Sequence, residues 1–360
     1  MKYSIIVPVF NRPDEVDELL ESLTRQTFSD FEVVIVEDGS QVRCEDVVQR
    51  YSGRLDVRYF EKPNSGPGQS RNYGAERSRG EYLIVLDSDV VLPEGYLAEV
   101  DKELTENPCE AFGGPDRAHE SFTPVQKAIN YSMTSFFTTG GIRGGKKKLD
   151  KFYPRSFNMG IKKDLYQQLD GFSNMRFGED IDFSIRIFKS GARCRLFPEA
   201  WVWHKRRTDF RKFFRQVHNS GIARINLYKK YPESLKLVHL LPAVFTVGVV
   251  ACLLLFLLGI AMFCYGEWLD ANGLRPTDNM HQGVGFVFCV MALLPILLYS
   301  LIILIDSSIR NRSLWVGILS IPASFIQLIG YGTGFIRAWW LRCVCGRNEE
   351  LQAFRKNFYK

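Results

Sequence analysis

The first 237 residues of this 360-residue chain lack any apolar run long enough to cross a bilayer. The N-terminal stretch MKYSIIVPVFNR lacks both the length and the small-residue cleavage site of a signal peptide. No G-x-G-x-x-G follows the first expected strand, and G-x-x-x-x-G-K-[ST] occurs nowhere. The main sequence evidence for a Rossmann dinucleotide-binding domain or a P-loop nucleotidase is therefore missing. Without an export signal, the N-terminal part is expected to stay in the cytoplasm.

The eight cysteines are scattered and show no spacing typical of a metal site. Cys343 and Cys345 form a C-x-C pair, but no second pair stands in register with it, so we expect no zinc site. Free thiols in a reducing compartment are the simplest interpretation.

Long uncharged stretches appear only in the C-terminal third, at Leu240–Tyr265, Gly283–Ile305 and Ser313–Ile336. Each has at least 23 residues, and roughly 20 apolar residues span a hydrocarbon core. We therefore expect about three transmembrane helices, with a buried core helix as the alternative. The third stretch is interrupted by Pro322, Gly330, Gly332 and Gly334, so a kinked or re-entrant segment stays open for it.

One basic segment accounts for the net charge of +6: Lys205 to Lys230 carries nine Lys or Arg and one Asp. A general nucleic-acid binder would spread its basic residues over a face, so no nucleic acid is expected as a partner. The segment adjoins the first apolar stretch and has apolar residues at helical spacing. It indicates a helix in the membrane interface, where anionic lipid attracts basic side chains. An ordinary solvated basic helix is the alternative.

The distribution of basic residues does not decide how many times the chain crosses the membrane. Three crossings would place the tail after Ile336 outside, although that tail is basic. The short loop Ser307–Ser313, with Arg310 and Arg312, is expected inside as well. Three simple crossings cannot satisfy both, so either the third segment re-enters or the tail is translocated against the rule.

Strand-like and helix-like segments alternate over about the first 100 residues, which is typical of a doubly wound α/β sheet. The expected strands are KYSIIVPVF, FEVVIVEDGS, VRYFEK and EYLIVLDSD, with helices in RPDEVDELLESLTRQ and GQSRNYGAERS. Such sheets bind ligands at the carboxyl ends of their strands. Polar and aromatic side chains gather at those ends: Phe10, Asn11, Glu37, Asp38, Asp87 and Asp89.

Two acidic motifs can carry chemistry. Asp87 and Asp89, on one turn with Ser88 between them, can converge on a hard divalent cation that also holds phosphate; a turn or capping role is the alternative. Glu179 and Asp180 begin an expected helix, where acids commonly favour the helix dipole. A carboxylate there can also act as a general base toward a hydroxyl.

Five ordered blocks, from SIIVPVFNR to FGEDIDFSIRI, make residues 1 to 205 resemble the family 2 glycosyltransferases of GT-A fold. The resemblance implies an inverting transferase that uses a nucleotide-diphospho-sugar and a divalent cation, Mn²⁺ or Mg²⁺. Its metal ligands would be Asp87 and Asp89, with His204 as an additional metal or phosphate contact or a structural histidine. Asp180 matches the catalytic base, with Glu179 beside it. The nucleotide-sugar contacts implied are Pro8, Phe10, Asn11, Asp38, Arg71, Asn72, Asp87 and Ser88.

The sequence departs from two branches of that family. It lacks the Q-x-x-R-W of processive members, which disfavours polymerisation. The Glu179-Asp180 pair argues for a hydroxyl acceptor, because a polyprenyl phosphate is already ionised and needs no base; a polyprenyl-phosphate hexose synthase remains the alternative. A second alternative is a membrane scaffold protein without catalytic activity. The glycine- and lysine-rich segment 138–157 suits either a mobile loop or contact with an anionic acceptor.

We therefore expect four parts: a GT-A catalytic domain over 1–205, a basic interfacial segment over 206–237, a transmembrane region over 238–340 and a basic tail over 341–360. The implied localisation is the inner (cytoplasmic) membrane, with the catalytic domain in the cytoplasm. The expected partners are a nucleotide-sugar donor, a glycan or lipid-linked acceptor, and membrane lipid; that the donor is a UDP-sugar is implied by the resemblance alone.

Overall fold

The computed structural model describes residues 1–360 except 120, 141–153, 176, 275–279 and 351–360. The chain forms two compact units. The head unit comprises Met1–Phe122 and Lys147–Arg206, and the helical unit comprises Thr123–Lys146 and Arg207–Ala353. Thr123–Lys146 lies inside the range expected for the catalytic domain, yet it groups with the helical unit. Most of the glycine- and lysine-rich segment 138–157 lies outside the described residues.

The head unit is built on a mixed seven-stranded sheet in the order β3-β2-β1-β4-β8-β6-β9. The four strands expected from the sequence are present and parallel: β1 (Tyr3–Val9), β2 (Phe31–Asp38), β3 (Val57–Lys62) and β4 (Tyr82–Leu86). Next to β4, β8 (Asn158–Lys162) runs antiparallel, followed by β6 (Ala111–Gly113) and β9 (Cys194–Leu196). The carboxyl ends of β1, β2 and β4 therefore meet at one edge, as expected.

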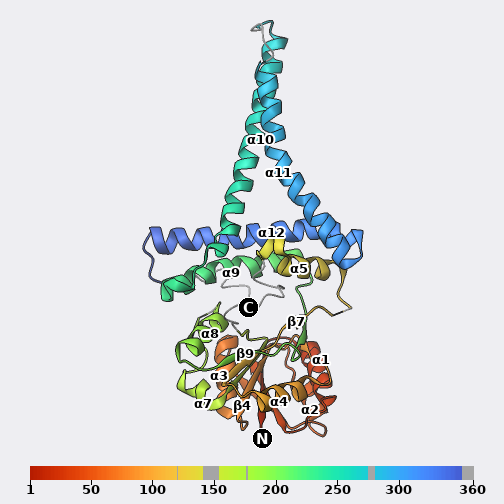
Figure 1. The fold of residues 1–360 in the computed structure, drawn as a ribbon, viewed down its shortest axis with the longest axis vertical. Helices are drawn as coiled ribbons and strands as arrows, with labels where there is room; N and C mark the ends of the chain where they lie inside the picture. The colour runs from red at the N-terminus through yellow and green to blue at the C-terminus, as the bar shows by residue number, and fades with distance from the viewer. Residues whose placement is uncertain (120, 141–153, 176, 275–279, 351–360) are drawn as a thin grey trace. The chain divides into compact units, whose positions relative to one another are not determined.

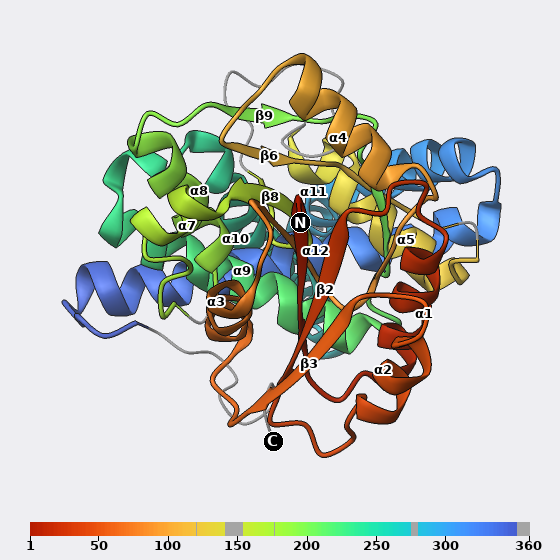
Figure 2. The same cartoon turned by 90° about the horizontal axis from the view of Figure 1, so that it is seen from below.

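Helices cover both faces of this sheet (Figure 2). Successive strand residues point to opposite faces, so Ile5 packs in one core and Ile6 in the other. The core around Ile5 holds side chains of α1 (Pro13–Thr24), α2 (Glu45–Tyr51) and α4 (Tyr96–Glu106). The core around Ile6 holds side chains of α3 (Pro67–Arg77), α7 (Lys163–Gln168) and α8 (Glu179–Lys189). Burial on both faces explains why β1, β2 and β4 read as continuous apolar runs.

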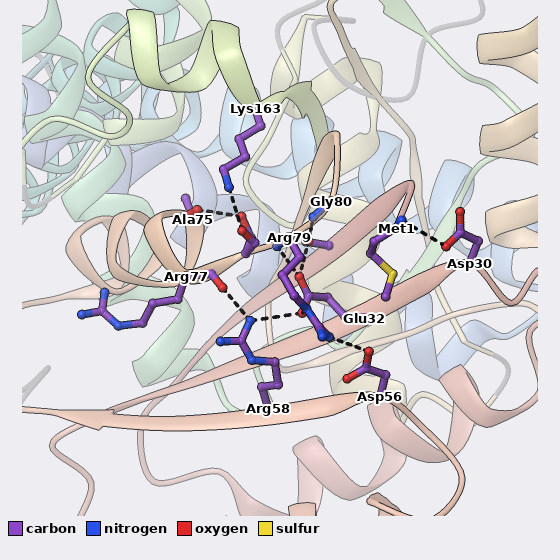
Figure 3. Close-up of polar contacts among 12 residues, drawn as sticks. Met1, Asp30, Glu32, Asp56, Arg58, Ala75, Arg77, Arg79, Gly80 and Lys163 are labelled. Atoms are coloured by element: carbon purple, nitrogen blue, oxygen red, sulfur yellow. Dashed lines mark hydrogen bonds and ion pairs between the residues drawn. The ribbon is translucent and has the colours of Figure 1, made fainter.

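A buried acid, Glu32, lies at the opposite end of the sheet. Its carboxylate accepts hydrogen bonds from Ser4 Oγ at 2.7 Å and Arg79 Nε at 2.8 Å, and Arg58 lies 3.3 Å away. Figure 3 shows both arginines directed at Glu32. Burial alone would raise the pKa of Glu32. These hydrogen bonds lower the pKa by more than burial raises it, so the net pKa lies below its usual value. This acid is a structural group remote from the predicted site.

A second, three-stranded sheet has the order β5-β10-β7. Its strands are β5 (Val90–Val91), β10 (Val202–His204) and β7 (Asp116–Arg117). β10 pairs antiparallel with β5 and parallel with β7. This small sheet ties the chain after β4 to the last residues of the head unit.

The helical unit contains three helices long and apolar enough to cross a membrane: α10 (Leu241–Ala271), α11 (Met280–Asn311) and α12 (Leu314–Trp339). The expected basic helix is present as α9 (Phe210–Lys230). Two shorter helices, α5 (Pro124–Thr134) and α6 (Phe136–Thr139), also belong to this unit. α10 and α11 form a hairpin, whereas α12 runs along α9 and α5 (Figure 1).

Candidate active site

The turn between β4 and β5 carries the first predicted motif. β4 is buried along its whole length and ends at Leu86, so the chain leaves the core at Asp87. Asp87 is partly exposed, whereas Ser88 and Asp89 are buried. The pairing of β5 with β10 fixes the far side of this turn, because the backbone N–H of Lys205 donates to Asp89 O at 3.1 Å. The two carboxylates are thus held at the carboxyl edge of the sheet.

His204 reaches this turn because it pairs with Val90 in the small sheet. Its Nε2 lies 3.2 Å from Oδ1 of Asp89. One ligand atom each from Asp87, Asp89 and His204 lies within 4.8 Å of the other two. Two carboxylates and an imidazole are donors that suit Mn²⁺. The donor set therefore fits a divalent cation, as expected for this motif.

Charged groups surround the cluster. Arg12 NH1 donates to Asp89 Oδ2 at 2.6 Å. Asp116 lies on the other side of the His204 ring, with its Oδ2 3.8 Å from Nδ1 of His204. The same oxygen forms an ion pair with Arg206 at 2.6 Å. Burial lowers the pKa of His204, but Asp89 and Asp116 more than offset this and raise it to about 9. Burial alone would raise the pKa of Asp116, and the contacts with His204 and Arg206 instead bring it well below its usual range.

Arg71 connects the two acidic motifs. It projects from α3, is 3% exposed, and donates to Asp87 Oδ1 at 2.7 Å and to Glu179 Oε1 at 3.3 Å. Burial lowers the pKa of Arg71, but the charges of Asp87 and Glu179 outweigh that and raise it. A buried guanidinium between carboxylates fixes their spacing. The structure therefore brings the motifs at 87–89 and 179–180 into one site.

Glu179 and Asp180 begin α8, as predicted. Burial and the charge of Asp180 raise the pKa of Glu179, Arg71 lowers it, and the net pKa is about 7. Asp180 is held at both oxygens: Arg155 NH1 lies 3.1 Å from Oδ2, and the backbone N–H of Ile181 donates to Oδ1 at 2.8 Å. A carboxylate in a fixed orientation is the arrangement that a general base needs.

The residues predicted for the nucleoside lie at the ends of β1 and β2. Asn11 has a positive φ of 54°, and its Oδ1 accepts from the backbone N–H groups of Gln41 and Val42 at 2.7 and 2.9 Å. Pro8 and Phe10, just before it, are partly exposed. Asn11 therefore joins the end of β1 to the loop after β2.

Asp38 closes the loop that leads into α3. Its carboxylate accepts from the backbone N–H groups of Ser65 and Gly66, both at 2.9 Å, and pairs with Lys62. Its side chain is 3% exposed. Asp38 is thus a rigid part of the edge formed by β2 and α3.

Asn72 has a different set of contacts from the one expected. Its Oδ1 accepts from Phe172 N at 2.8 Å and from the Tyr166 hydroxyl at 2.6 Å, and its Nδ2 donates to Phe172 O at 2.8 Å. These contacts tie α3 to α7 and the loop after it. They favour a structural role for Asn72 rather than one at base or phosphate.

The sequence did not point to Arg12, Asp116 and Arg155, whereas Arg206 was expected to contact either diphosphate or lipid. Arg12 follows the predicted Phe10-Asn11 pair and could have been included for that reason. Asp116 and Arg155 lie outside the recognised motifs. They enter the site because the short strands β7 and β10 and the turn before β8 place them there.

Residues 4–169 match the family model described as glycosyl transferase family 2. The chain thus carries a family 2 glycosyltransferase domain. An uncharacterised glycosyltransferase of Haemophilus influenzae is 35% identical over 193 residues, 52% of this chain and 62% of that protein. The poly(ribitol-phosphate) beta-N-acetylglucosaminyltransferase TarS of Staphylococcus aureus is 38% identical over 93 residues, 25% of this chain and 16% of that protein.

The mannosyltransferase PcManGT from Pyrobaculum calidifontis, solved with GDP-Man and Mn²⁺, has a TM-score of 0.55 and 17% identity, covering 81% of this chain and 86% of that chain. This likeness supports the expected GT-A fold of the family 2 domain. The chain spans less than two thirds of its first curated relatives, 62% and 58%. The predicted family and the mixed α/β fold followed by three long apolar helices are confirmed.

Proposed function

We propose that the chain is an inverting, metal-dependent glycosyltransferase. It moves a sugar from a nucleotide-diphospho-sugar to a hydroxyl of a lipid-linked or cell-surface glycan precursor at the cytoplasmic face of the membrane. One observation carries this proposal: Asp87, Asp89 and His204 converge within 4.8 Å at the carboxyl edge of the sheet. Arg71 links that cluster to the Glu179-Asp180 motif.

Asp87, Asp89 and His204 would hold the divalent cation. When bound, such a cation neutralises charge that develops on a diphosphate leaving group. The metal assignment rests on the donor set of this chain; PcManGT, of the same fold, was solved with Mn²⁺. Asp116 orients His204 from the other side of the ring and stabilises its position, as carboxylates often do for metal-binding histidines.

Asp180 would act as the general base. The acceptor oxygen forms a bond to the anomeric carbon while the bond from that carbon to the diphosphate oxygen breaks. The hydroxyl proton passes to Asp180, and the nucleoside diphosphate leaves with the bonding electron pair. A single displacement of this kind inverts the anomeric centre. Glu179, whose pKa of about 7 reflects its burial, stands beside the base and in contact with Arg71.

The donor is proposed to be a UDP-sugar, with Pro8, Phe10, Asn11 and Asp38 forming the nucleoside side of the site. Relatives differ on this point: TarS is named as an N-acetylglucosaminyltransferase of a ribitol-phosphate polymer, and PcManGT was solved with GDP-Man. A surface polymer or its precursor as acceptor is in keeping with the name of TarS and with the apolar helices of this chain.

Turnover of nucleotide-sugars by detergent-purified full chain tests this function. UDP-, GDP- and dTDP-sugars are offered with Mn²⁺ or with chelator, and nucleotide release is measured. We expect release from one UDP-sugar, dependent on the cation and lost in Asp89→Ala. Release that persists at full rate with chelator would contradict the proposal.

The variant Asp180→Asn separates a hydroxyl acceptor from a phosphate acceptor. With a hydroxyl acceptor, transfer falls by about 10²–10⁴-fold, the usual contribution of a general base. Near-normal transfer to polyprenyl phosphate would instead identify a polyprenyl-phosphate hexose synthase. If the chain binds no nucleotide-sugar in the presence of Mn²⁺, the enzyme proposal is wrong and the alternative of a non-catalytic membrane scaffold is favoured.

A further inference from the structure

Helix α9 is amphipathic and too strongly charged to cross a bilayer. Its 21 residues contain six Lys or Arg and no acid. Arg215 and Arg224 lie well inside the helix rather than at its ends, where long basic side chains could reach a membrane surface. Its apolar face is covered: Phe213, Val217 and Ile225 are buried. A basic helix whose apolar face packs on a neighbouring apolar helix suits the membrane surface, where anionic lipid attracts its basic side chains.

α12 runs beside α9 in the same chain direction, and close contacts fix the register. A Cβ on Gly330 would lie 2.5 Å from Cγ2 of Val217, and one on Gly334 would lie 2.1 Å from the carbonyl oxygen of His218. Farther along, Arg342 NH1 donates to Asn226 Oδ1 at 2.7 Å. Small residues at spacing i, i+4 let the two backbones approach closely. α12 is therefore fixed along α9 and must share its depth in the membrane.

The first half of α12 packs against the short helix α5, as the second half packs against α9. Val316 and Ala323 of α12 pack with Ala128 of α5 and with Phe210 at the start of α9. Of the most apolar 18 residues of α12, 39% are buried, against 6% for α10 and 11% for α11. The contacts of α12 thus extend over its length and engage polar, amphipathic helices.

The α10–α11 hairpin behaves differently. α12 touches α10 near its beginning, where a Cβ on Gly332 would lie 2.3 Å from the carbonyl oxygen of Pro242. It touches α11 near its end, where Ser307 and Ser320 share a hydrogen bond of 2.7 Å. Away from these two contacts with α12, helices α10 and α11 pack on each other through Gly259 and Gly285. Their side chains there are largely exposed leucines, valines and phenylalanines, which suit lipid.

We propose that the chain crosses the membrane only twice, through α10 and α11, and that α12 lies with α9 in the interface. Since residues 1–206 precede α9, the residues after α12 return to the same side as the head unit. We call α9 and α12 together the interfacial pair; its lipid partner is an anionic bilayer surface. This inference does not depend on the transferase chemistry.

The charge pattern agrees with two crossings. Five arginines and no acid lie between Ser307 and Asn348, so this segment is expected on the same side as the basic helix α9. The far end of the hairpin, residues 266–281, carries three acids and one arginine. Two crossings place every basic segment on one side, which three crossings cannot do. The conflict noted in the sequence is thereby resolved.

Single-cysteine labelling of the full chain tests the topology. In a background without the other cysteines, one variant retains the exposed native Cys345, one has Ser52→Cys in the head unit, and one has Asn272→Cys at the far end of the hairpin. Each variant is reacted with a membrane-impermeant maleimide in inverted vesicles and in intact cells. We expect Cys345 and S52C to react in inverted vesicles only, and N272C in intact cells only.

Two outcomes would overturn the inference. Reaction of Cys345 together with N272C would mean that α12 crosses the membrane. Reaction of all three sites from one side would mean that the hairpin does not cross. Because removing buried cysteines such as Cys44 can disturb folding, reporter fusions on the unmodified chain provide the second measurement. A fluorescent protein fused after Lys360 should fold and fluoresce, and alkaline phosphatase fused there should be inactive; the reverse result would also overturn the inference.

Discussion

The guanidinium of Arg155 lies 3.1 Å from Oδ2 of Asp180, while the backbone N–H of Ile181 donates to Oδ1. The proposed base is therefore oriented at both oxygens. Arg155 comes from the turn before β8 and Asp180 from the start of α8, so their contact joins two elements across the site. The position of Asp180 depends on Arg155 as well as on the helix that carries it.

Replacing Arg155 by Met is expected to lower kcat by about tenfold, because a misplaced catalytic group loses part of the gain from orientation. Donor and cation affinity should stay unchanged, since Arg155 has no contact with the Asp87–Asp89 turn among the contacts described. Arg195→Met, which removes a partly buried ion pair with Glu103 outside the proposed site, is the matched control. Weaker donor binding at normal kcat would show that Arg155 acts on the donor instead.

The metal cluster predicts a specific pH dependence for cation binding. His204 has a pKa of about 9 in the metal-free chain, so a cation must displace a proton from it at neutral pH. Mn²⁺ affinity should therefore increase with pH from about 6.5 to 9, by at most about tenfold per unit. Calorimetric titration at several pH values measures this slope. In His204→Gln the slope should be largely lost; an unchanged slope would remove His204 from the ligand set.

Glu179 gives a pH effect on stability with a definite sign. Its pKa of about 7 in the folded chain exceeds the ordinary value of 4.5, so folding favours the protonated form. The stability that this group contributes is complete below about pH 4.5 and is lost as the pH rises to about 7. In Glu179→Gln this loss should disappear, and the variant should gain in melting temperature relative to the native chain between pH 5 and 8. A constant difference across that range would contradict the assignment.

Two glycines test the packing of the interfacial pair. A Cβ on Gly334 would lie 2.1 Å from the carbonyl oxygen of His218, whereas one on Gly248 in α10 meets nothing within 4 Å. Gly334→Ala should therefore destabilise the helical unit by about 1–3 kcal/mol, the usual cost of overpacking. Gly248→Ala should be neutral or slightly stabilising, because alanine favours helix. Thermal unfolding in detergent compares the two, and equal melting temperatures would contradict the close α9–α12 contact.

The parallel part of the head-unit sheet was predictable because β1, β2 and β4 are largely apolar runs that end in polar residues. The turn that carries Asp87 and Asp89 was predictable from the end of β4, and the start of α8 from its acidic first turn. Arg12, Asp116 and Arg155 were not predictable in their roles, because each reaches the site through contacts between elements distant in sequence. β10 has only three residues, too few for a periodic signal, yet it brings His204 to Asp89.

The membrane region was predictable in its helices but not in their arrangement. An apolar run of 24 residues predicts a span whether it faces lipid or a neighbouring helix. The distinguishing signal was the series Gly330, Gly332 and Gly334 in Ser313–Ile336, for which a kinked or a re-entrant segment was left open. In the structure α12 is one continuous helix, and these glycines allow close contacts with α9 and α10.

Calorimetric titration of a UDP-sugar into the detergent-purified chain, with and without Mn²⁺, tests the proposed metal-dependent donor site most directly. Asp89→Asn removes one charge from the proposed metal site, and Glu32→Gln removes one from the remote buried cluster as a control. Donor binding should require Mn²⁺, be lost in Asp89→Asn and be retained in Glu32→Gln. Donor binding that is equal with and without Mn²⁺, and equal in Asp89→Asn, would contradict the proposal.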